Sequence, residues 1–227
     1  MNAVRSVLHR WRLVLAGILV VGLLVGGFAV AWFSSLLSVR SIEVQAAPSV
    51  PEEAVRGVIG VPGGTPLLQV DTHDVAARVA GIPKVAEARV SRALPSTLRV
   101  EILERVPAVF FDAPGGSHLM DAEGVVFAVE PPPEGLPRLV TDEPGEDDPA
   151  TRAALDVLAS LAGELRAMVL EARAGSPVDV RLALSDGRTV IWGDAGDSAY
   201  KARVAQALLT QPGQVYDVSS PSLPVIR

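Results

Sequence analysis

The stretch that decides the fold is IPKVAEARVSRALPSTLRVEILERVPAVFF, residues 82–111. Two segments within it, Lys84–Ser91 and Thr97–Glu104, alternate apolar and polar residues, which is the period of a β-strand with one buried face. The apolar positions that share a face are Ala86, Ala88, Val90, Leu98, Val100 and Ile102. Because Pro95 turns the chain between the segments, we expect two antiparallel strands whose apolar face is covered by helices.

The residues before this hairpin supply a strand and two helices. An alternating run over 42–45 indicates the strand. Ser49 and Glu52 have the spacing of a capping box at the start of a short helix. Asp71 is suited to begin a second helix as its N-cap. We therefore expect a small α+β module, ordered strand, helix, helix, strand, strand, over residues 38–107.

An apolar run precedes this module. Residues 13–37 contain no charged side chain, and about 20 apolar residues in a helix cross a bilayer. Arg5, Arg10 and Arg12 stand before the run, and the first acidic residue is Glu43. Because short basic segments stay in the cytoplasm, we expect one transmembrane helix with the tail inside and the rest of the chain outside.

A cleaved signal peptide is the alternative. Ala29-Val30-Ala31 resembles the small-residue site at which such peptides are cut. Apolar residues continue beyond it to Leu37, however, and the run is longer than a usual signal core. We therefore expect an uncleaved anchor, with residues 1–12 as a cytoplasmic tail.

Composition limits the possible functions. The 227-residue chain has a formal net charge of −6, and its basic N-terminal tail makes the remainder more acidic still. An acidic exterior argues against nonspecific nucleic-acid binding, which needs a basic surface. The chain has no cysteine, so disulfides, thiolate chemistry and a lipoprotein anchor are excluded.

The second half of the chain predicts a mixed α/β domain with a largely antiparallel sheet over residues 108–220. A helix should begin at Pro149, capped by Asp148, and a later helix should be capped by Asp197 or Ser198. The first helix should carry a stripe of Leu155, Leu158, Leu161 and Leu165. The expected strands are 109–111, 118–120, 125–129, 168–174, 178–184, 188–192 and 215–218, and residues 136–140 should form a short ordered stretch.

The first module resembles the POTRA domain of FtsQ/DivIB cell-division proteins. The resemblance rests on Pro83-x-Val85, Ala88-x-Val90-x-Arg92, Pro95-x-Thr97-Leu98 and Glu104-Arg105-x-Pro107. The second domain resembles the β domain of the same family in SDGRTVIWGDAGDSAYKARVAQALL, residues 185–209, and YDVSSPSLPVI, residues 216–226. Many relatives have an arginine where this chain has Ser219, which weakens any inference about an arginine-dependent contact.

The sequence shows no catalytic constellation. The histidines are His9, His73 and His118, and none has an obvious catalytic neighbour. Asp71 and Asp74 beside His73 are explained by helix capping rather than metal binding. Nucleotide-binding, zinc and hydrolase motifs are absent from the sequence. We predict no enzyme, no cofactor and no metal, although distant carboxylates that converge for glycan hydrolysis stay open from sequence alone.

Protein binding remains as the expected activity. A strand at a sheet edge offers unpaired backbone groups to a partner's strand, and we expect residues 215–218 to form such an edge. The resemblance implies that this edge, with the preceding helix, receives an FtsB/DivIC-type partner paired to an FtsL-type coiled coil. The candidate residues are Val215, Tyr216, Asp217, Val218, Ser219, Ser220 and Lys201. The alternative is that the tail, 221–227, merely caps the edge; the POTRA-like module offers a second candidate edge.

The resemblance implies a non-enzymatic scaffold of bacterial septation in the cytoplasmic membrane. Such a protein would link divisome proteins, with the septal synthase as a further candidate, and help recruit or regulate septal peptidoglycan synthesis. The alternative is an exported POTRA module for polypeptide transport or assembly. Proteins of that class usually carry tandem POTRA units and an outer-membrane barrel, whereas this sequence has one unit and no barrel pattern.

Overall fold

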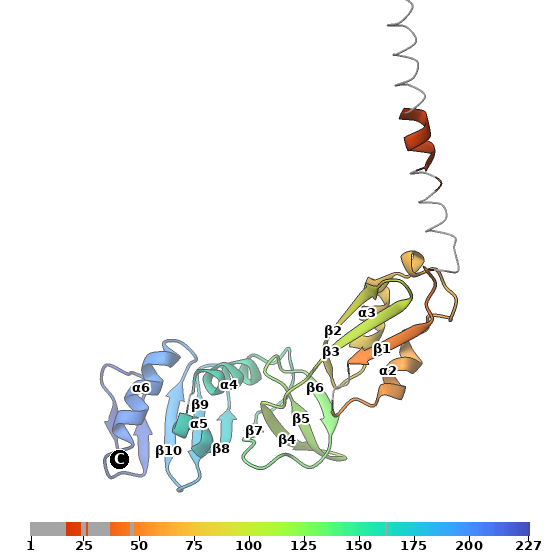
Figure 1. The fold of residues 1–227 in the computed structure, drawn as a ribbon. Helices are drawn as coiled ribbons and strands as arrows, with labels where there is room; N and C mark the ends of the chain where they lie inside the picture. The colour runs from red at the N-terminus through yellow and green to blue at the C-terminus, as the bar shows by residue number, and fades with distance from the viewer. Residues whose placement is uncertain (1–16, 24–25, 27–36, 46–47, 162) are drawn as a thin grey trace, which may run out of the picture. The chain divides into compact units, whose positions relative to one another are not determined.

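The computed structural model describes residues 17–23, 26, 37–45, 48–161 and 163–227 (Figure 1). The chain divides into two compact units, Met1–Glu104 and Arg105–Arg227. The predicted tail, 1–12, and most of the predicted membrane span, 13–37, lie outside the described residues. Within the described part of the chain, no helix combines the length and the hydropathy needed to cross a membrane.

The first unit has the predicted order of elements. They are β1 (Ser41–Gln45), α2 (Glu52–Ile59), the short 3-10 helix η2 (Leu67–Gln69), α3 (Thr72–Ala80), β2 (Val85–Ala93) and β3 (Thr97–Glu104). β3 lies in the middle of a three-stranded sheet, parallel to β1 and antiparallel to β2. Leu98 and Val100 of β3 share one buried core with Val55 of α2 and Val79 of α3. The helices therefore cover the apolar face of the hairpin.

Two local predictions in this unit are wrong. A β-bulge follows Val85, and the extra residue leaves Ala86 exposed while Val85 occupies the core. Ser49 does not cap α2, whose N-cap is Pro51 without a side-chain hydrogen bond. Ser49 lies too early for its hydroxyl to reach the free amides of the first turn, and its backbone N–H donates to Glu104 Oε1 at 2.7 Å.

The second unit is built on a nine-stranded sheet, in the order β12-β11-β10-β9-β8-β7-β4-β5-β6. Its strands are β4 (Val109–Ala113), β5 (Gly116–Met120), β6 (Val126–Val129), β7 (Arg138–Val140), β8 (Val169–Ala174), β9 (Val180–Leu184), β10 (Thr189–Gly193), β11 (Val215–Asp217) and β12 (Val225–Ile226). Its helices are α4 (Pro149–Ser160), α5 (Gly163–Met168) and α6 (Ser198–Leu208). The pairs β4–β7, β7–β8 and β10–β11 are parallel and the others antiparallel, so the predicted mixed α/β domain with a largely antiparallel sheet is confirmed.

Helix α4 packs against β8 and β9 and contacts α6. Asp148 caps it as predicted, accepting from Thr151 N at 2.8 Å and Ala150 N at 3.2 Å. Side chains of α4 join Trp192 of β10 and Tyr216 of β11 in one buried core. The core therefore fixes the position of the strands at the C-terminal end of the sheet.

The predicted long leucine helix is wrong, because it breaks after Ser160. Leu161 is extended at φ −80° and ψ 137°, and Gly163 has a φ of +56°, a left-handed conformation that glycine accommodates. The stripe is still buried across α4, Leu161 and α5. The predicted strand from Val178 begins later, at Val180, because Asp179 N donates to Ser176 O in a turn.

Candidate partner-binding site

The candidate site lies at one end of the nine-stranded sheet, where β10, β11 and β12 meet α6 (Figure 1). β11 runs parallel to β10, with Tyr216 opposite Val190. Tyr216 is fully buried, and its hydroxyl donates to Gln211 O at 2.7 Å. The Arg188 guanidinium lies 5.5 Å from the centroid of the tyrosine ring. These contacts make Tyr216 the anchor of β11.

The prediction that residues 215–218 form the edge is wrong by one strand. β12 pairs antiparallel with β11, with Tyr216 opposite Ile226. Val215 and Arg227 exchange two backbone hydrogen bonds of 2.9 Å. The open edge therefore belongs to β12, which consists of Val225 and Ile226. A strand this short gives almost no periodic signal, so sequence reasoning missed it.

Lys201 does not face a partner as predicted. Its side chain is 3% exposed, and its ammonium donates to Asp194 Oδ1 at 2.9 Å and Asp194 O at 3.0 Å. The hydrogen bond from Lys201 lowers the pKa of Asp194, and a further bond from Gly196 N acts in the same direction. Lys201 therefore positions the loop between β10 and α6 instead of offering a contact surface.

The same loop starts α6 without the predicted side-chain cap. Asp197 occupies the N-cap at a φ of +53° and makes no capping hydrogen bond. Ser198 Oγ accepts from Trp192 Nε1 at 3.0 Å and donates to Ala195 O at 2.8 Å. The serine hydroxyl therefore satisfies the buried indole N–H, and the helix start is held by the core.

The other predicted residues end β11 and begin its connection to β12. Asp217 Oδ1 accepts from Ser219 N at 3.0 Å and from Ser219 Oγ at 2.6 Å. Val218 is buried, and its N–H donates to Ile191 O at 2.9 Å. Ser219 and Ser220 are exposed, whereas Val215 and Asp217 are half-buried. The side chains of Ser219 and Ser220 are thus the most accessible of the predicted set.

Exposed apolar residues that the sequence reasoning did not select lie beside the edge. Leu223 is 80% exposed and Val225 is 43% exposed. Both belong to the predicted tail, 221–227, which folds back so that Leu223 N donates to Ser220 O at 2.9 Å. The β-branched pair Val225–Ile226 after Pro224 was the available signal for an added strand.

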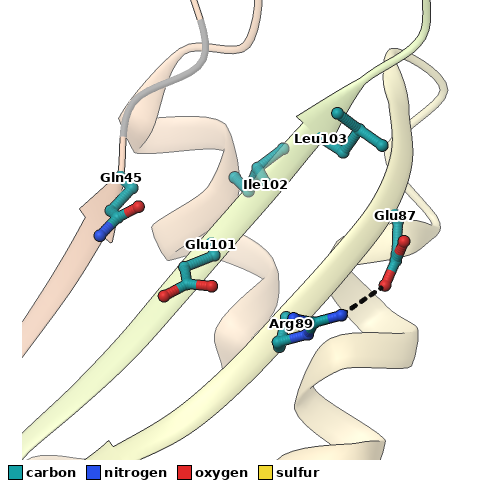
Figure 2. A pocket seen from close by; sticks show the side chains of 6 residues that line it. All are labelled: Gln45, Glu87, Arg89, Glu101, Ile102 and Leu103. Atoms are coloured by element: carbon teal, nitrogen blue, oxygen red, sulfur yellow. Dashed lines mark hydrogen bonds and ion pairs between the residues drawn. The ribbon is translucent and has the colours of Figure 1, made fainter.

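A hollow of about 220 Å³ lies on the three-stranded sheet of the first unit (Figure 2). It is lined by Gln45, Glu87, Arg89, Glu101, Ile102 and Leu103. Figure 2 shows Arg89 reaching along β2 to Glu87, at 3.4 Å. This ion pair is well exposed and therefore weak. The hollow offers charges of both signs and a hydrophobic margin at Leu103, but no arrangement for bond-breaking chemistry.

The titratable residues considered from sequence have structural contacts. Asp71 accepts from His73 N at 3.0 Å and Asp74 N at 3.1 Å, which confirms it as the N-cap of α3. These backbone bonds lower its pKa. The His118 ring stacks on Phe111 with centroids 5.2 Å apart. Among the described residues, no three His, Cys, Asp or Glu side chains gather as a metal site requires.

Comparison with known proteins bears on both units. Residues 37–105 match the family model of the FtsQ-type POTRA domain. Residues 108–220 match that of the C-terminal domain of cell division protein FtsQ/DivIB. The similar proteins include a Mycobacterium tuberculosis cell division protein FtsQ, 44% identical over 225 residues that make up 99% of this chain and 72% of the relative. The chain belongs to the FtsQ/DivIB family.

Two further relatives, both named cell division protein FtsQ, agree with this membership. The Mycolicibacterium smegmatis protein is 50% identical over 196 residues, 86% of this chain and 59% of the relative. The Corynebacterium glutamicum protein is 32% identical over 216 residues, 94% of this chain and 97% of the relative. The chain thus spans about three fifths of the length of the M. smegmatis relative. The family assignment confirms the resemblance in both units.

Proposed function

We propose that this chain is a non-enzymatic, single-span membrane scaffold of bacterial cell division. It links divisome proteins and helps recruit or regulate septal peptidoglycan synthesis. Its partners are an FtsB/DivIC-type and an FtsL-type protein, with the septal synthase as a further candidate. It resides in the cytoplasmic membrane at the septum, with its N-terminus inside. Membership of the FtsQ/DivIB family supports the divisome role.

The observation that carries this proposal is the two-residue edge strand β12. Because Val215 and Arg227 form a hydrogen-bonded pair, the alternation of an antiparallel ladder turns the N–H and C=O of Ile226 away from β11. The N–H and C=O of Ile226 can therefore each form a hydrogen bond with the backbone of a partner's strand. Leu223 and Val225 place exposed apolar side chains beside it.

A partner strand can use this edge in two ways. It can pair with the outer side of β12, extending the sheet, or it can displace β12 and pair with β11 directly. Displacing β12 breaks few hydrogen bonds, because the strand has two residues, and a net backbone hydrogen bond contributes only about 1 kcal/mol. The predicted residues 215–217 would contact the partner's backbone only in the second case.

Capture of the FtsB/DivIC-type protein of the same organism, co-expressed with the full chain in membranes, tests the site. Ile226→Pro removes the outward N–H, and Ile226→Val is the matched control that keeps it. Pairing on β12 predicts a loss of capture in Ile226→Pro and in a chain lacking 221–227. Displacement of β12 predicts increased capture by the shortened chain. Unchanged capture in both would reject the edge as the site.

Depletion of the protein followed by microscopy tests the cellular role. A division scaffold predicts long filaments without septa, because septal wall synthesis is not recruited. Normal septation together with an export defect would overturn this role and favour the transport or assembly alternative. Complementation with Ile226→Val and failure with Ile226→Pro would connect the edge to the phenotype.

A further inference from the structure

The nine-stranded sheet has a second edge, at β6, far along the sheet from β12. β6 pairs with β5 on one side, and within the described part of the chain no strand pairs with its other side. Its sequence is Val-Phe-Ala-Val. Val126 is 39% exposed and Val129 is 54% exposed. β6 carries exposed valines and no lysine or proline of its own, two of the devices that keep other strands away; its bulge lies between Val126 and Ala128, before Val129.

The backbone of Val129 faces outward. Glu130 N donates to Ser117 O at 3.1 Å, and His118 stands opposite Val129 in the ladder. Opposed residues in an antiparallel pair alternate between hydrogen-bonded and non-hydrogen-bonded positions. Ser117–Glu130 is a hydrogen-bonded position, so the N–H and C=O of Val129 point away from β5.

The beginning of β6 lies in acidic surroundings. Glu123 is exposed in the turn before it. The loop 142–148 reaches this turn, since a Cβ on Gly124 would lie 2.9 Å from Glu146 Cα. Exposed carboxylates of that loop are those of Asp142, Glu143, Glu146 and Asp147. Arg152 donates its Nε to the Glu146 carbonyl and offsets part of this charge, and the turn and loop remain net negative.

This charge decides what fits the edge. Residues 122–137 contain three glutamates and no lysine or arginine. A second copy of β6 would therefore bring acidic flanks against acidic flanks, whether it paired parallel or antiparallel, and facing like charges destabilise strand pairs. A strand with basic residues beside Glu123 and Glu146 is complementary in charge.

We propose that β6 receives an extended polypeptide segment of a partner protein, with apolar residues at alternate positions and Lys or Arg at one end. The segment adds a strand beside β6, with its backbone on Val129 and its basic end near Glu123 and Glu146. Because β6 and β12 are the two edge strands of the same sheet, one domain can hold two partner segments at once. This inference goes beyond the proposed function and does not require the β12 site.

A fluorescein-labelled peptide of alternating valine and threonine, with lysines at one end, tests the proposal by anisotropy on the full-length protein in detergent. Val129→Pro removes the outward N–H and should weaken binding about fivefold, since a net hydrogen bond contributes about 1 kcal/mol. Val129→Thr keeps the N–H and is the matched control. The same loss should appear when Val129→Pro and Val129→Thr are compared in an Ile226→Pro background, in which the opposite edge is blocked.

A charge swap gives the second arm. Glu123→Lys combined with Glu146→Lys should weaken binding of the lysine-ended peptide and strengthen binding of a glutamate-ended peptide. Circular dichroism should show the same fold. Equal binding of both peptides to both proteins, or undiminished binding to Val129→Pro, would overturn the proposal. Self-association that Val129→Pro abolishes would overturn it in favour of a second copy. If the peptide does not bind the unmutated protein, the proposal is also overturned, and the edge is too short to receive a strand.

Discussion

The Lys201 ammonium lies 2.9 Å from Asp194 Oδ1 and joins the start of α6 to the end of β10. The two partners differ in environment: the lysine side chain is 3% exposed, whereas the aspartate side chain is 57% exposed. Removing the carboxylate leaves a buried cation with the Asp194 carbonyl alone. Removing the cation leaves a carboxylate that water can solvate. The same ion pair therefore has unequal consequences when broken from its two sides.

The two substitutions should differ in cost. Asp194→Ala should lower the free energy of unfolding by about 3 kcal/mol, because it strands a buried charge. Lys201→Met should cost about 1 kcal/mol, because the apolar stem is kept and the exposed partner is hydrated. Urea unfolding followed by Trp192 fluorescence, in a Trp11→Phe, Trp32→Phe background, measures both. The reverse order of costs would contradict this reading of the pair.

Acid should weaken the same contact. Lys201, through its hydrogen bond, lowers the pKa of Asp194 in the folded protein. Because the folded-state pKa lies below the unfolded value of about 3.9, the ionised carboxylate stabilises the fold at higher pH. This stabilisation is lost as the pH falls through the folded-state pKa. The stability difference between the original protein and Lys201→Met should be constant near neutral pH and shrink below pH about 4. A gap that widens in acid would show the opposite linkage.

Two glycines near the ends of β10, Gly187 before the strand and Gly193 as its last residue, provide a matched test of how the C-terminal segment packs. Gly187 and Gly193 have φ values of +84° and +77°, so alanine at either should cost about 1 kcal/mol in backbone strain. A Cβ on Gly193 would also lie 2.9 Å from Ser219 Cβ, whereas one on Gly187 meets nothing within 4 Å. Gly193→Ala should therefore cost more. Hydrogen exchange over 215–227 should accelerate in that variant and not in Gly187→Ala.

A buried ion pair at the start of the second unit should outweigh an exposed one. Asp121 is 2% exposed, pairs with Arg105 and accepts from Val125 N at 2.9 Å. Asp121→Ala should destabilise by about 3 kcal/mol, because it removes the carboxylate that pairs with the largely buried guanidinium and accepts from the amides of Glu123 and Val125. Asp112→Ala breaks the half-exposed pair with Arg138 and should cost under about 1 kcal/mol. Equal costs in urea unfolding would contradict the role of burial.

Local signals were read well from the sequence. Asp71 and Asp148 cap their helices because an aspartate reaches amides two and three residues ahead, a geometry contained within one short segment. The hairpin of β2 and β3 was predicted from the alternation over 84–104, because this signal also lies within one short segment of the chain. Errors arose where one residue changes the register, as at the bulge that exposes Ala86.

The candidate site was read less well, since its properties depend on residues far apart in the chain. Lys201 resembles a surface cation in its own helix, and it is buried because Asp194 and the core close over it. Residues 215–217 resemble an edge, and the return of Val225–Ile226 covers them. A two-residue strand is defined by its pairing with a neighbour, and its own sequence carries only the weak signal of two β-branched residues.

Three features followed from the sequence: the family, the order of elements in the first unit and the largely antiparallel sheet of the second. Periodicity, turn residues and helix caps act within a few residues, and such patterns can be read along the chain. The tertiary structure alone decided which strands bound the nine-stranded sheet. An edge is defined by the absence of a neighbour, and that depends on how distant segments pair and on which hydrogen bonds remain unmade.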